Sequence, residues 1–266
     1  MGLPGEPQMT ARFFVQPEQI AGDTAVIQGE ELVHLAAVLR LVPGDQVVVC
    51  DGIGMEYHGV VEEVRPEAAS VRIHNRVAGA GEPQVKITLV QGLPKGDKMD
   101  FVVQKGTEVG IAEFIPVITE RTVVQLTDAK ARRRVERWQR IAKEAAKQCR
   151  RAVIPKVREP LLWRECIEQY REDGGGRIGL IPWEEIAGTG TGLKDVLISI
   201  QGRVDAGEVD NIWLFIGPEG GFSEGEVQQA AAAGAYTVSL GPRILRTETA
   251  GAVTAAVVLY HLGELG

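Results

Sequence analysis

Cysteine and histidine are scarce in this sequence, and their positions exclude the chemistry that they usually supply. The 266 residues contain only 3 cysteines, Cys50, Cys149 and Cys166, and none belongs to a CxxC pair. An odd number of widely separated cysteines argues against a disulfide framework and against a zinc site. The 4 histidines are equally scattered, without the spacing of metal ligands. The sequence therefore predicts no bound metal.

Long apolar runs are also missing. No segment approaches the roughly 18 consecutive apolar residues that cross a bilayer, and residues 1–9 lack the charged head and apolar core of a secretion signal. That Gly/Pro-rich start is expected to be disordered. A hydrophobic content of 44% and a charged content of 24% are ordinary for a globular chain. We therefore expect a cytoplasmic protein with no membrane partner.

The common nucleotide-binding motifs are absent. No GxGxxG follows a predicted strand, which excludes a Rossmann dinucleotide site and the usual methyltransferase loop. No GxxxxGK[ST] is present either, although Lys95-Gly96-Asp97-Lys98 resembles part of a phosphate-binding loop. No hydrolytic triad is suggested.

Positive charge is low overall but concentrated in one segment. The formal net charge is −7, which by itself does not favour nucleic-acid binding. Between residues 130 and 158, however, only Glu136 and Glu144 oppose a dense series of basic side chains. These are Lys130, Arg132, Arg133, Arg134, Arg137, Arg140, Lys143, Lys147, Arg150, Arg151, Lys156 and Arg158. Such a segment is either a solvated helix face or a track for phosphates.

Hydrophobic periodicity divides the chain into two domains. β-branched runs predict strands at 46–50, 57–64 and 69–76, and helical spacing predicts a helix at 29–39. These elements indicate a small β-barrel-like domain over residues 1–78, followed by a Gly/Pro-containing linker at 79–84. The remainder, 85–266, alternates strands and helices, which is typical of an α/β domain with a largely parallel sheet. Its predicted strands are 85–91, 113–118, 177–181, 211–216 and 237–240, and its predicted helices are 98–109, 129–151, 224–233 and 247–261.

Two glycine-rich segments near the C-terminus follow predicted strands. In the first, the strand 211–216 leads into Gly217-Pro218-Glu219-Gly220-Gly221 and then into a helix marked by Ser223 and Glu226 as a capping box. In the second, Gly241-Pro242 precedes a helix that begins near Thr247. Either loop alone fits a tight turn as well as a ligand site, and Thr247 and Glu248 suit helix capping. Because ligands bind at the carboxyl ends of parallel strands, two such loops together favour a ligand site.

These residues closely resemble the RsmE family, bacterial 16S ribosomal RNA methyltransferases that act on N3 of a uridine. The resemblance rests chiefly on residues 217–223 and 240–250 and continues over most of the chain. The further matching segments are 12–14, 34–40, 95–100, 104–110, 119–121, 137–141 and 144–148. One departure is Cys149-Arg150-Arg151, where the family commonly has a small residue and glycine before the arginine.

The resemblance implies a SPOUT-type C-terminal domain with a parallel sheet and a trefoil knot, and a PUA-like N-terminal β-barrel domain. It also implies a homodimer, S-adenosyl-L-methionine as cofactor, and 16S rRNA of the small ribosomal subunit as substrate. Carried over to this sequence, the cofactor contacts fall on three loops. They are Leu180, Ile181, Ile216, Gly217, Pro218, Glu219, Gly220, Leu240, Gly241, Ile244, Leu245, Arg246 and Thr249.

The chemistry implied by the resemblance is deprotonation of uridine N3 beside the methyl donor. We expect Arg246 to hydrogen-bond O2 or O4 and spread the developing negative charge, and Glu248 to accept the proton. Glu219 either binds the ribose hydroxyls or faces the sulfonium. RNA contacts are expected from both domains: Arg12, Arg40, Arg133, Arg137, Arg140, Lys147, Arg150 and Arg151.

Three other functions remain open from the sequence. A related SPOUT enzyme would methylate a ribose 2′-hydroxyl with similar glycine-rich loops. A ribosome-assembly factor would bind RNA without catalysis, although the retained glycines and Arg246 do not favour it. A metabolic enzyme would use residues 217–221 to bind a phosphate, with the basic segment as a solvated face.

Overall fold

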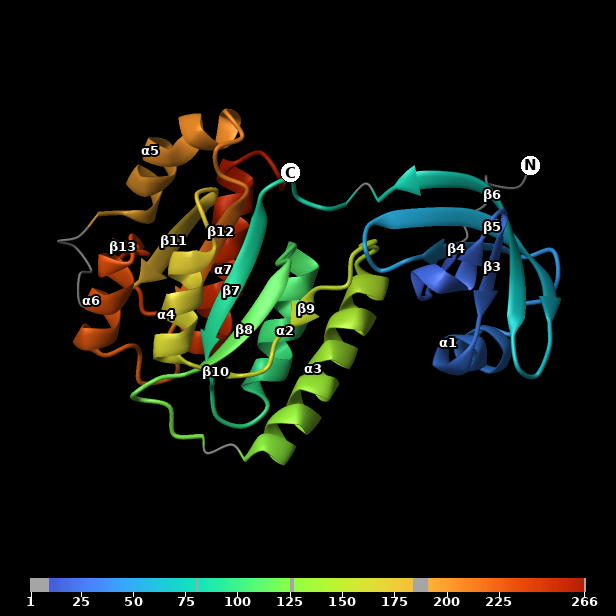
Figure 1. The fold of residues 1–266 in the computed structure, drawn as a ribbon, viewed down its shortest axis with the longest axis horizontal. Helices are drawn as coiled ribbons and strands as arrows, with labels where there is room; N and C mark the ends of the chain where they lie inside the picture. The colour runs from blue at the N-terminus through green and yellow to red at the C-terminus, as the bar shows by residue number, and fades with distance from the viewer. Residues whose placement is uncertain (1–9, 80, 125–126, 184–190, 266) are drawn as a thin grey trace, which may run out of the picture. The chain divides into compact units, whose positions relative to one another are not determined.

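A computed structural model of the chain describes residues 10–79, 81–124, 127–183 and 191–265 (Figure 1). The chain forms two compact units. The N-terminal unit comprises residues 1–82 and 146–154, and the C-terminal unit comprises 83–145 and 155–266. The expected disorder of residues 1–9 falls outside the described residues. None of the described helices is long and apolar enough to cross a membrane.

The N-terminal unit is built on a six-stranded sheet with the order β1-β4-β5-β6-β3-β2. β1 pairs with β4 in parallel, and the other neighbours are antiparallel. The strands are β1 (Ala11–Phe14), β2 (Ile20–Ala21), β3 (Thr24–Ile27), β4 (Gln46–Cys50), β5 (Met55–Val64) and β6 (Ala69–Ala78), with a 3₁₀ turn, η1 (Pro17–Gln19), before β2. The three strands predicted in this region are confirmed, and three shorter ones join them.

A helix covers the core of this unit, as the sequence predicted. It begins as α1 (Gly29–Val33) and continues as a π-helical segment, η2 (His34–Val38). Leu32 and Leu35 come from these two turns and pack with Phe13 and Val49 from the sheet. Alternate strand residues point to the same face, so the apolar positions of each strand collect in this core.

Residues 146–154 pack into the N-terminal unit, although the sequence placed them in the C-terminal domain. Ala146, at the end of the basic helix, is fully buried with Phe14, Val48 and Cys50. The carboxylate of Glu82 accepts a hydrogen bond from the backbone N–H of Val153 at 3.1 Å. The N-terminal unit is thus formed by two separate segments of the chain, whereas the sequence predicted one segment and a single linker at 79–84.

The C-terminal unit contains a seven-stranded sheet in which every pairing is parallel. The order is β10-β8-β7-β12-β11-β13, and β9 pairs with β8. The strands are β7 (Lys86–Gly92), β8 (Glu113–Ile118), β9 (Lys156–Val157), β10 (Leu161–Leu162), β11 (Arg177–Pro182), β12 (Asn211–Ile216) and β13 (Tyr236–Val238). The predicted α/β class and parallel sheet are confirmed.

Helices cover both faces of this sheet (Figure 1). Leu89 and Leu214 face a core shared with α2, α3, α5 and α7, whereas Val90 and Phe215 face α4 and α6. The helices are α2 (Lys98–Val109), α3 (Asp128–Gln148), α4 (Trp163–Glu172), α5 (Leu193–Asp205), α6 (Glu224–Ala232) and α7 (Thr247–His261). Because the strands run parallel, the loops that follow β7, β11, β12 and β13 emerge at one edge of the sheet.

Candidate functional site

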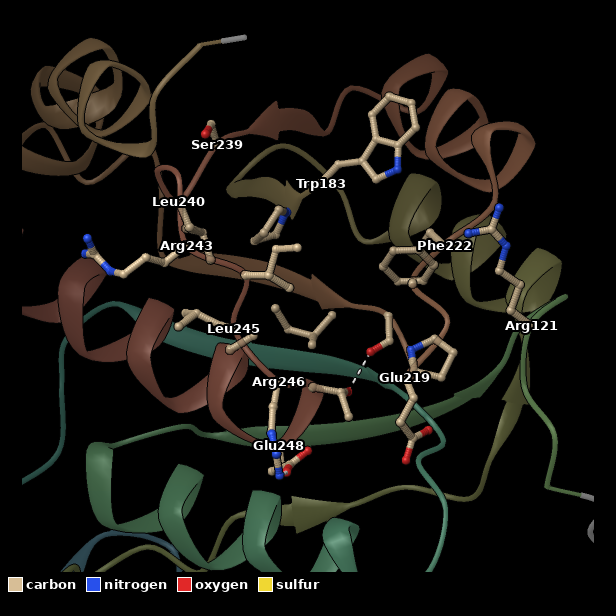
Figure 2. Close-up of a pocket in the computed structure, with 18 of the residues that line it drawn as sticks. Arg121, Trp183, Glu219, Phe222, Ser239, Leu240, Arg243, Leu245, Arg246 and Glu248 are labelled. Carbon is tan, nitrogen blue, oxygen red and sulfur yellow. Dashed lines mark hydrogen bonds and ion pairs between the residues drawn. The ribbon is translucent and has the colours of Figure 1, made fainter. Parts of the chain in front are cut away.

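A pocket with a volume of about 420 Å³ opens at this edge of the sheet (Figure 2). It receives residues from the ends of β11 and β12, from the segment after β13, and from the first turns of α2 and α7. Its lining consists of Lys98, Arg121, Pro182, Trp183, Ile216, Gly217, Pro218, Glu219, Gly221, Phe222, Ser239, Leu240, Gly241, Pro242, Arg243, Ile244, Leu245, Arg246, Thr247, Glu248 and Ala250. Both glycine-rich segments predicted from the sequence therefore form walls of one pocket.

The first glycine-rich loop folds tightly back on itself. A Cβ on Gly217 would lie 2.8 Å from the carbonyl carbon of Gly221, closer than real Cβ atoms come. Ser223 then caps α6, because its Oγ accepts from the N–H of Glu226 at 3.3 Å and Glu226 Oε2 accepts from the N–H of Ser223 at 2.9 Å. The predicted capping box is confirmed, and it fixes where the loop ends.

A buried hydrogen-bond chain ties the two glycine-rich segments to β7. Gln91 is fully buried and donates from Nε2 to Thr247 Oγ1 at 2.9 Å. Thr247 Oγ1 in turn donates to the carbonyl oxygen of Gly217 at 2.6 Å. Buried hydrogen bonds of this kind hold their neighbours in one arrangement, although Oε1 of Gln91 has no hydrogen-bond partner among the described residues. Thr247 lies between Arg246 and Glu248, so the same chain positions both candidate catalytic residues.

Four charged side chains form a cluster in the pocket. Lys98 Nζ lies 2.8 Å from Glu219 Oε1 and 3.6 Å from Glu248 Oε2. Arg246 NH1 lies 3.9 Å from Glu248 Oε1. Arg246 and Glu248 lie side by side in Figure 2. The arrangement places two cations and two carboxylates beside the loop that follows β12.

The hydrogen bonds of this cluster shift two pKa values in opposite directions. For Glu219, partial burial acts to raise the pKa, but donors from Lys98 and from the N–H of Lys95, at 3.0 Å, outweigh it and lower the pKa. For Lys98, the hydrogen bond to Glu219 raises the pKa of the ammonium group. Both groups are thus held in their charged forms.

Most of the predicted cofactor contacts line the pocket, but four do not. Leu180 and Ile181 are fully buried in the cores on the two faces of the sheet, so their side chains do not reach the pocket. The next two residues along, Pro182 and Trp183, line the pocket instead. Gly220 and Thr249 are not in the lining either, and neither are residues of the basic helix α3. The nine predicted residues in the lining are Ile216, Gly217, Pro218, Glu219, Leu240, Gly241, Ile244, Leu245 and Arg246.

The pocket side chains that the sequence interpretation did not assign include Lys98, Arg121, Trp183 and Phe222. Arg121 NH1 donates to the carbonyl of Gly220 at 2.8 Å, which brings the β8–α3 segment to the rim. Lys98 had a signal, since it belongs to the Lys95–Asp100 segment that resembles the family. Its proximity to Glu219, 121 positions away, depends on the tertiary fold.

Three of the predicted RNA-binding residues are engaged in ion pairs with little exposure. Arg12 pairs with Glu56 at 2.8 Å, with side chains 12% and 11% exposed. Lys147 pairs with Glu31 at 2.8 Å, and Arg151 pairs with Glu82 at 2.7 Å. The Lys147 and Arg151 side chains are only 11% and 4% exposed. These positions therefore correct the expectation, because the three cations are committed to carboxylates of the N-terminal unit.

The other predicted RNA-binding residues are accessible. Arg133 and Arg140 are exposed on α3, and Arg40 and Arg150 are exposed on the N-terminal unit. Arg40 and Arg150 have left-handed backbones, with φ of 54° and 65°. Arg137 is half exposed and contacts Asp100 at the start of α2. Four exposed arginines thus remain as candidates for phosphate contacts.

No group of three or more His, Cys, Asp or Glu residues is arranged to hold a metal ion among the residues that the structure describes. Cys50 and Cys166 are buried, and burial raises the pKa of each thiol to about 12. Such thiols remain protonated at neutral pH, so neither is a reactive nucleophile.

Comparisons with known proteins agree with the geometry of the site. Residues 81–259 match the RNA methyltransferase domain, and residues 27–73 match the RNA methyltransferase PUA domain. Ribosomal RNA small subunit methyltransferase E of Bacillus subtilis is 33% identical over 94% of this chain and 96% of its own length. The chain belongs to this RNA methyltransferase family.

Other relatives of the family agree over similar lengths. Ribosomal RNA small subunit methyltransferase E of Mycobacterium bovis is 32% identical over 92% of this chain and 90% of its own. The solved structure of the Neisseria gonorrhoeae enzyme, bound to S-adenosyl methionine, superposes with a TM-score of 0.80. It is 31% identical and covers 94% of this chain and 97% of its own. The PUA-like and α/β units expected from the sequence are thus those of the family.

Proposed function

We propose that this enzyme transfers the methyl group of S-adenosylmethionine to N3 of a uridine in the 16S rRNA of the small ribosomal subunit. The observation that carries the proposal is the composition of the pocket. Its lining combines apolar residues with an arginine and a glutamate, and the last two lie 3.9 Å apart. Family membership supports an rRNA methyltransferase, and the paired Arg246 and Glu248 support attack by a nitrogen that must lose a proton.

The residues present fit the cofactor. A volume of about 420 Å³ lies within the range of roughly 300–1,000 Å³ found for small-molecule sites. Leu240, Ile244 and Leu245 provide apolar contacts for an adenine ring, and the glycine-rich loop brings backbone groups close to it. The bound cofactor would supply an activated methyl group on a sulfonium. Glu219 already accepts hydrogen bonds from Lys98 and from the N–H of Lys95. We therefore favour a role in which Glu219 fixes the position of its loop and adds negative charge to the pocket, rather than acting as the sole ligand of the ribose.

Arg246 and Glu248 can perform the proton chemistry that uridine N3 requires. Glu248 lines the pocket with a side chain that is 17% exposed, and its buried Oε2 receives no hydrogen bond from the described residues, so the carboxylate can accept the N3 proton. The side chain of Arg246 is 85% exposed in the pocket lining, where it can donate to O2 or O4 as negative charge develops. Since N3 is blocked in a Watson–Crick pair, the target uridine must be unpaired or flipped out.

Transfer of a labelled methyl group tests the substrate. The enzyme and labelled S-adenosylmethionine are incubated with small subunits that lack the modification, with naked 16S rRNA, and with large subunits. We expect label in the 16S rRNA. Label confined to large subunits would overturn the assignment. No transfer, with binding of a nucleotide phosphate but not of S-adenosylmethionine in calorimetry, would favour a phosphate-binding enzyme instead.

We also propose that the exposed face of α3 contacts the RNA backbone. Arg133 and Arg140 lie seven positions apart on this helix, so they occupy similar faces. Replacing both by alanine should weaken RNA binding about equally for different sequences and lower the salt slope of log K by about 2. The measurement is RNA affinity over a salt series. Arg12→Ala is the comparison, because an arginine committed to Glu56 should change this slope little; a larger change at Arg12 would contradict the assignment.

We propose that the enzyme is a homodimer joined through α7. This helix packs against α2, β7 and β12, yet Val253, Val257 and Tyr260 on another face are 42%, 46% and 73% exposed. Their spacing places them on one stripe of the helix, where a second copy would bury them. Val257→Glu should shift the wild-type dimer toward monomer in sedimentation velocity. A wild-type chain that sediments as a monomer would contradict the proposal.

A further inference from the structure

Lys98 occupies a position that none of the expected roles explains. It is the first residue of α2, directly after the loop that follows β7. Its side chain is 37% exposed and lines the pocket. The ammonium group lies 2.8 Å from Glu219 and 3.6 Å from Glu248, so a single cation serves two carboxylates from different loops.

The two carboxylates differ in how they are satisfied. Glu219 Oε1 accepts hydrogen bonds from Lys98 Nζ and from the backbone N–H of Lys95. The Glu248 side chain is 17% exposed, against 31% for Glu219. Its Oε2 lies 3.6 Å from the ammonium group of Lys98 and receives no hydrogen bond from the described residues. The positive charge of Lys98 therefore lies next to the buried oxygen of Glu248, whereas the other oxygen, Oε1, lies 3.9 Å from Arg246.

The other charged groups nearby do not replace Lys98. Arg246 is 3.9 Å from the opposite oxygen of Glu248 and is 85% exposed, so solvent screens it more. Arg121 is engaged with the carbonyl of Gly220. Asp97 and Asp100, at the start of α2, face Arg137. Lys98 is thus the least exposed cation that contacts Glu248.

We infer that Lys98 is a positioning residue for the reaction, which offsets the negative charge of Glu219 beside Glu248 and so supports Glu248 as the proton acceptor. Two carboxylates that share a site without a cation between them repel each other, which favours protonation of one of them. A protonated Glu248 cannot remove the proton from uridine N3. The inference rests on the proposed function, because it assigns to Glu248 the role of proton acceptor.

A purely structural role for Lys98 makes a different prediction. Its hydrogen bond to Glu219 joins the loop after β7 to the loop after β12, and loss of this tie would loosen the pocket. Loosening would impair the enzyme at every pH and irrespective of the charge at position 219. The charge role instead predicts an effect that depends on pH and on the presence of the Glu219 carboxylate.

A double-mutant cycle separates these roles. The variants are Lys98→Met, Lys98→Arg, Glu219→Gln and the double variant Lys98→Met/Glu219→Gln, with Arg164→Met on α4 as a control of exposed charge. The readouts are the single-turnover methylation rate at saturating S-adenosylmethionine from pH 6 to 9 and the calorimetric Kd for the cofactor. Thermal unfolding checks each fold, and Lys98→Gln serves as a second neutral variant if Lys98→Met is unstable.

We expect Lys98→Met to lower the rate about 10- to 100-fold at pH 7, a part of the factor that a general base supplies. The loss should diminish toward pH 9, Lys98→Arg should retain most activity, and Lys98→Met should cost much less in the Glu219→Gln background. Equal losses in both backgrounds at all pH values would overturn the inference in favour of a structural tie. If the wild-type enzyme does not methylate uridine N3, the proposed function fails instead, and the two failures are distinct.

Discussion

Arg246→Ala is expected to lower kcat by about 10²- to 10³-fold, the cost of removing one donor that stabilises a developing anion. The guanidinium is 85% exposed and reaches Glu248 only at 3.9 Å, so the fold gains little from it. The Kd for S-adenosylmethionine should therefore change by less than about threefold, which corresponds to under 1 kcal/mol. Single-turnover rates and calorimetric titration measure the two quantities.

Arg164→Ala is the matched control for this variant. Arg164 is also highly exposed, and it pairs with Glu168 on the same helix, outside the pocket lining. It should leave both kcat and cofactor affinity unchanged. If Arg246→Ala weakens cofactor affinity as much as it lowers turnover, Arg246 binds the cofactor or supports the loop rather than the transition state.

Gly92→Ala is expected to disrupt the cofactor pocket by displacing the loop that follows β12. Gly92 is the last residue of β7, and a Cβ there would lie 2.5 Å from the backbone nitrogen of Pro218. The clashing atoms belong to the backbone and to the ring of Pro218, so no flexible side chain can move aside to relieve the clash. The Gly217-Pro218 loop must therefore shift. Overpacking of this kind costs about 1–3 kcal/mol, which corresponds to roughly 5- to 150-fold in cofactor affinity if the loop must be restored on binding. Calorimetry and thermal unfolding measure the two effects.

Gly202→Ala provides the comparison for this glycine. Gly202 lies within α5, and nothing lies within 4 Å of a Cβ at that position. Alanine in a helix interior should stabilise the protein by up to about 1 kcal/mol. A Gly92→Ala protein with unaltered affinity and melting temperature would show that the loop does not depend on its contact with β7.

Most elements with local signals were predictable, but α4 and α5, which also carry such signals, were not predicted. The apolar runs of β7 and β12 and the capping box at Ser223 identify themselves within a few residues. β9 and β10 are two residues long and carry no periodic signal. The missed α4 does show apolar residues at helical spacing, Trp163, Cys166, Ile167 and Tyr170, but charged residues between them obscured the pattern.

For the functional site as well, features with a local sequence signal were predicted and features that depend on distant contacts were not. The glycine-rich loops were found because each lies directly between a strand and a helix. Arg12, Lys147 and Arg151 were misjudged because their partners Glu56, Glu31 and Glu82 are 44, 116 and 69 positions away. A count of charges along the chain cannot reveal such pairing.

One departure from the family pattern has a physical meaning in the structure. Arg150 stands where the sequence resemblance implies a glycine, and its backbone is left-handed, with φ of 65°. Glycine adopts this conformation without steric cost, whereas another residue costs about 1–2 kcal/mol there. The left-handed backbone at the end of the basic segment would suit a glycine, and this chain adopts it with arginine.

The central claim is that the pocket directs the methyl group to uridine N3, and the identity of the product tests it most directly. Small subunits labelled by the enzyme are digested to nucleosides, which are separated and identified by mass spectrometry. We predict that the label appears as 3-methyluridine, and that Glu248→Gln abolishes most of it. Label on a ribose 2′-hydroxyl or on another base would contradict the account.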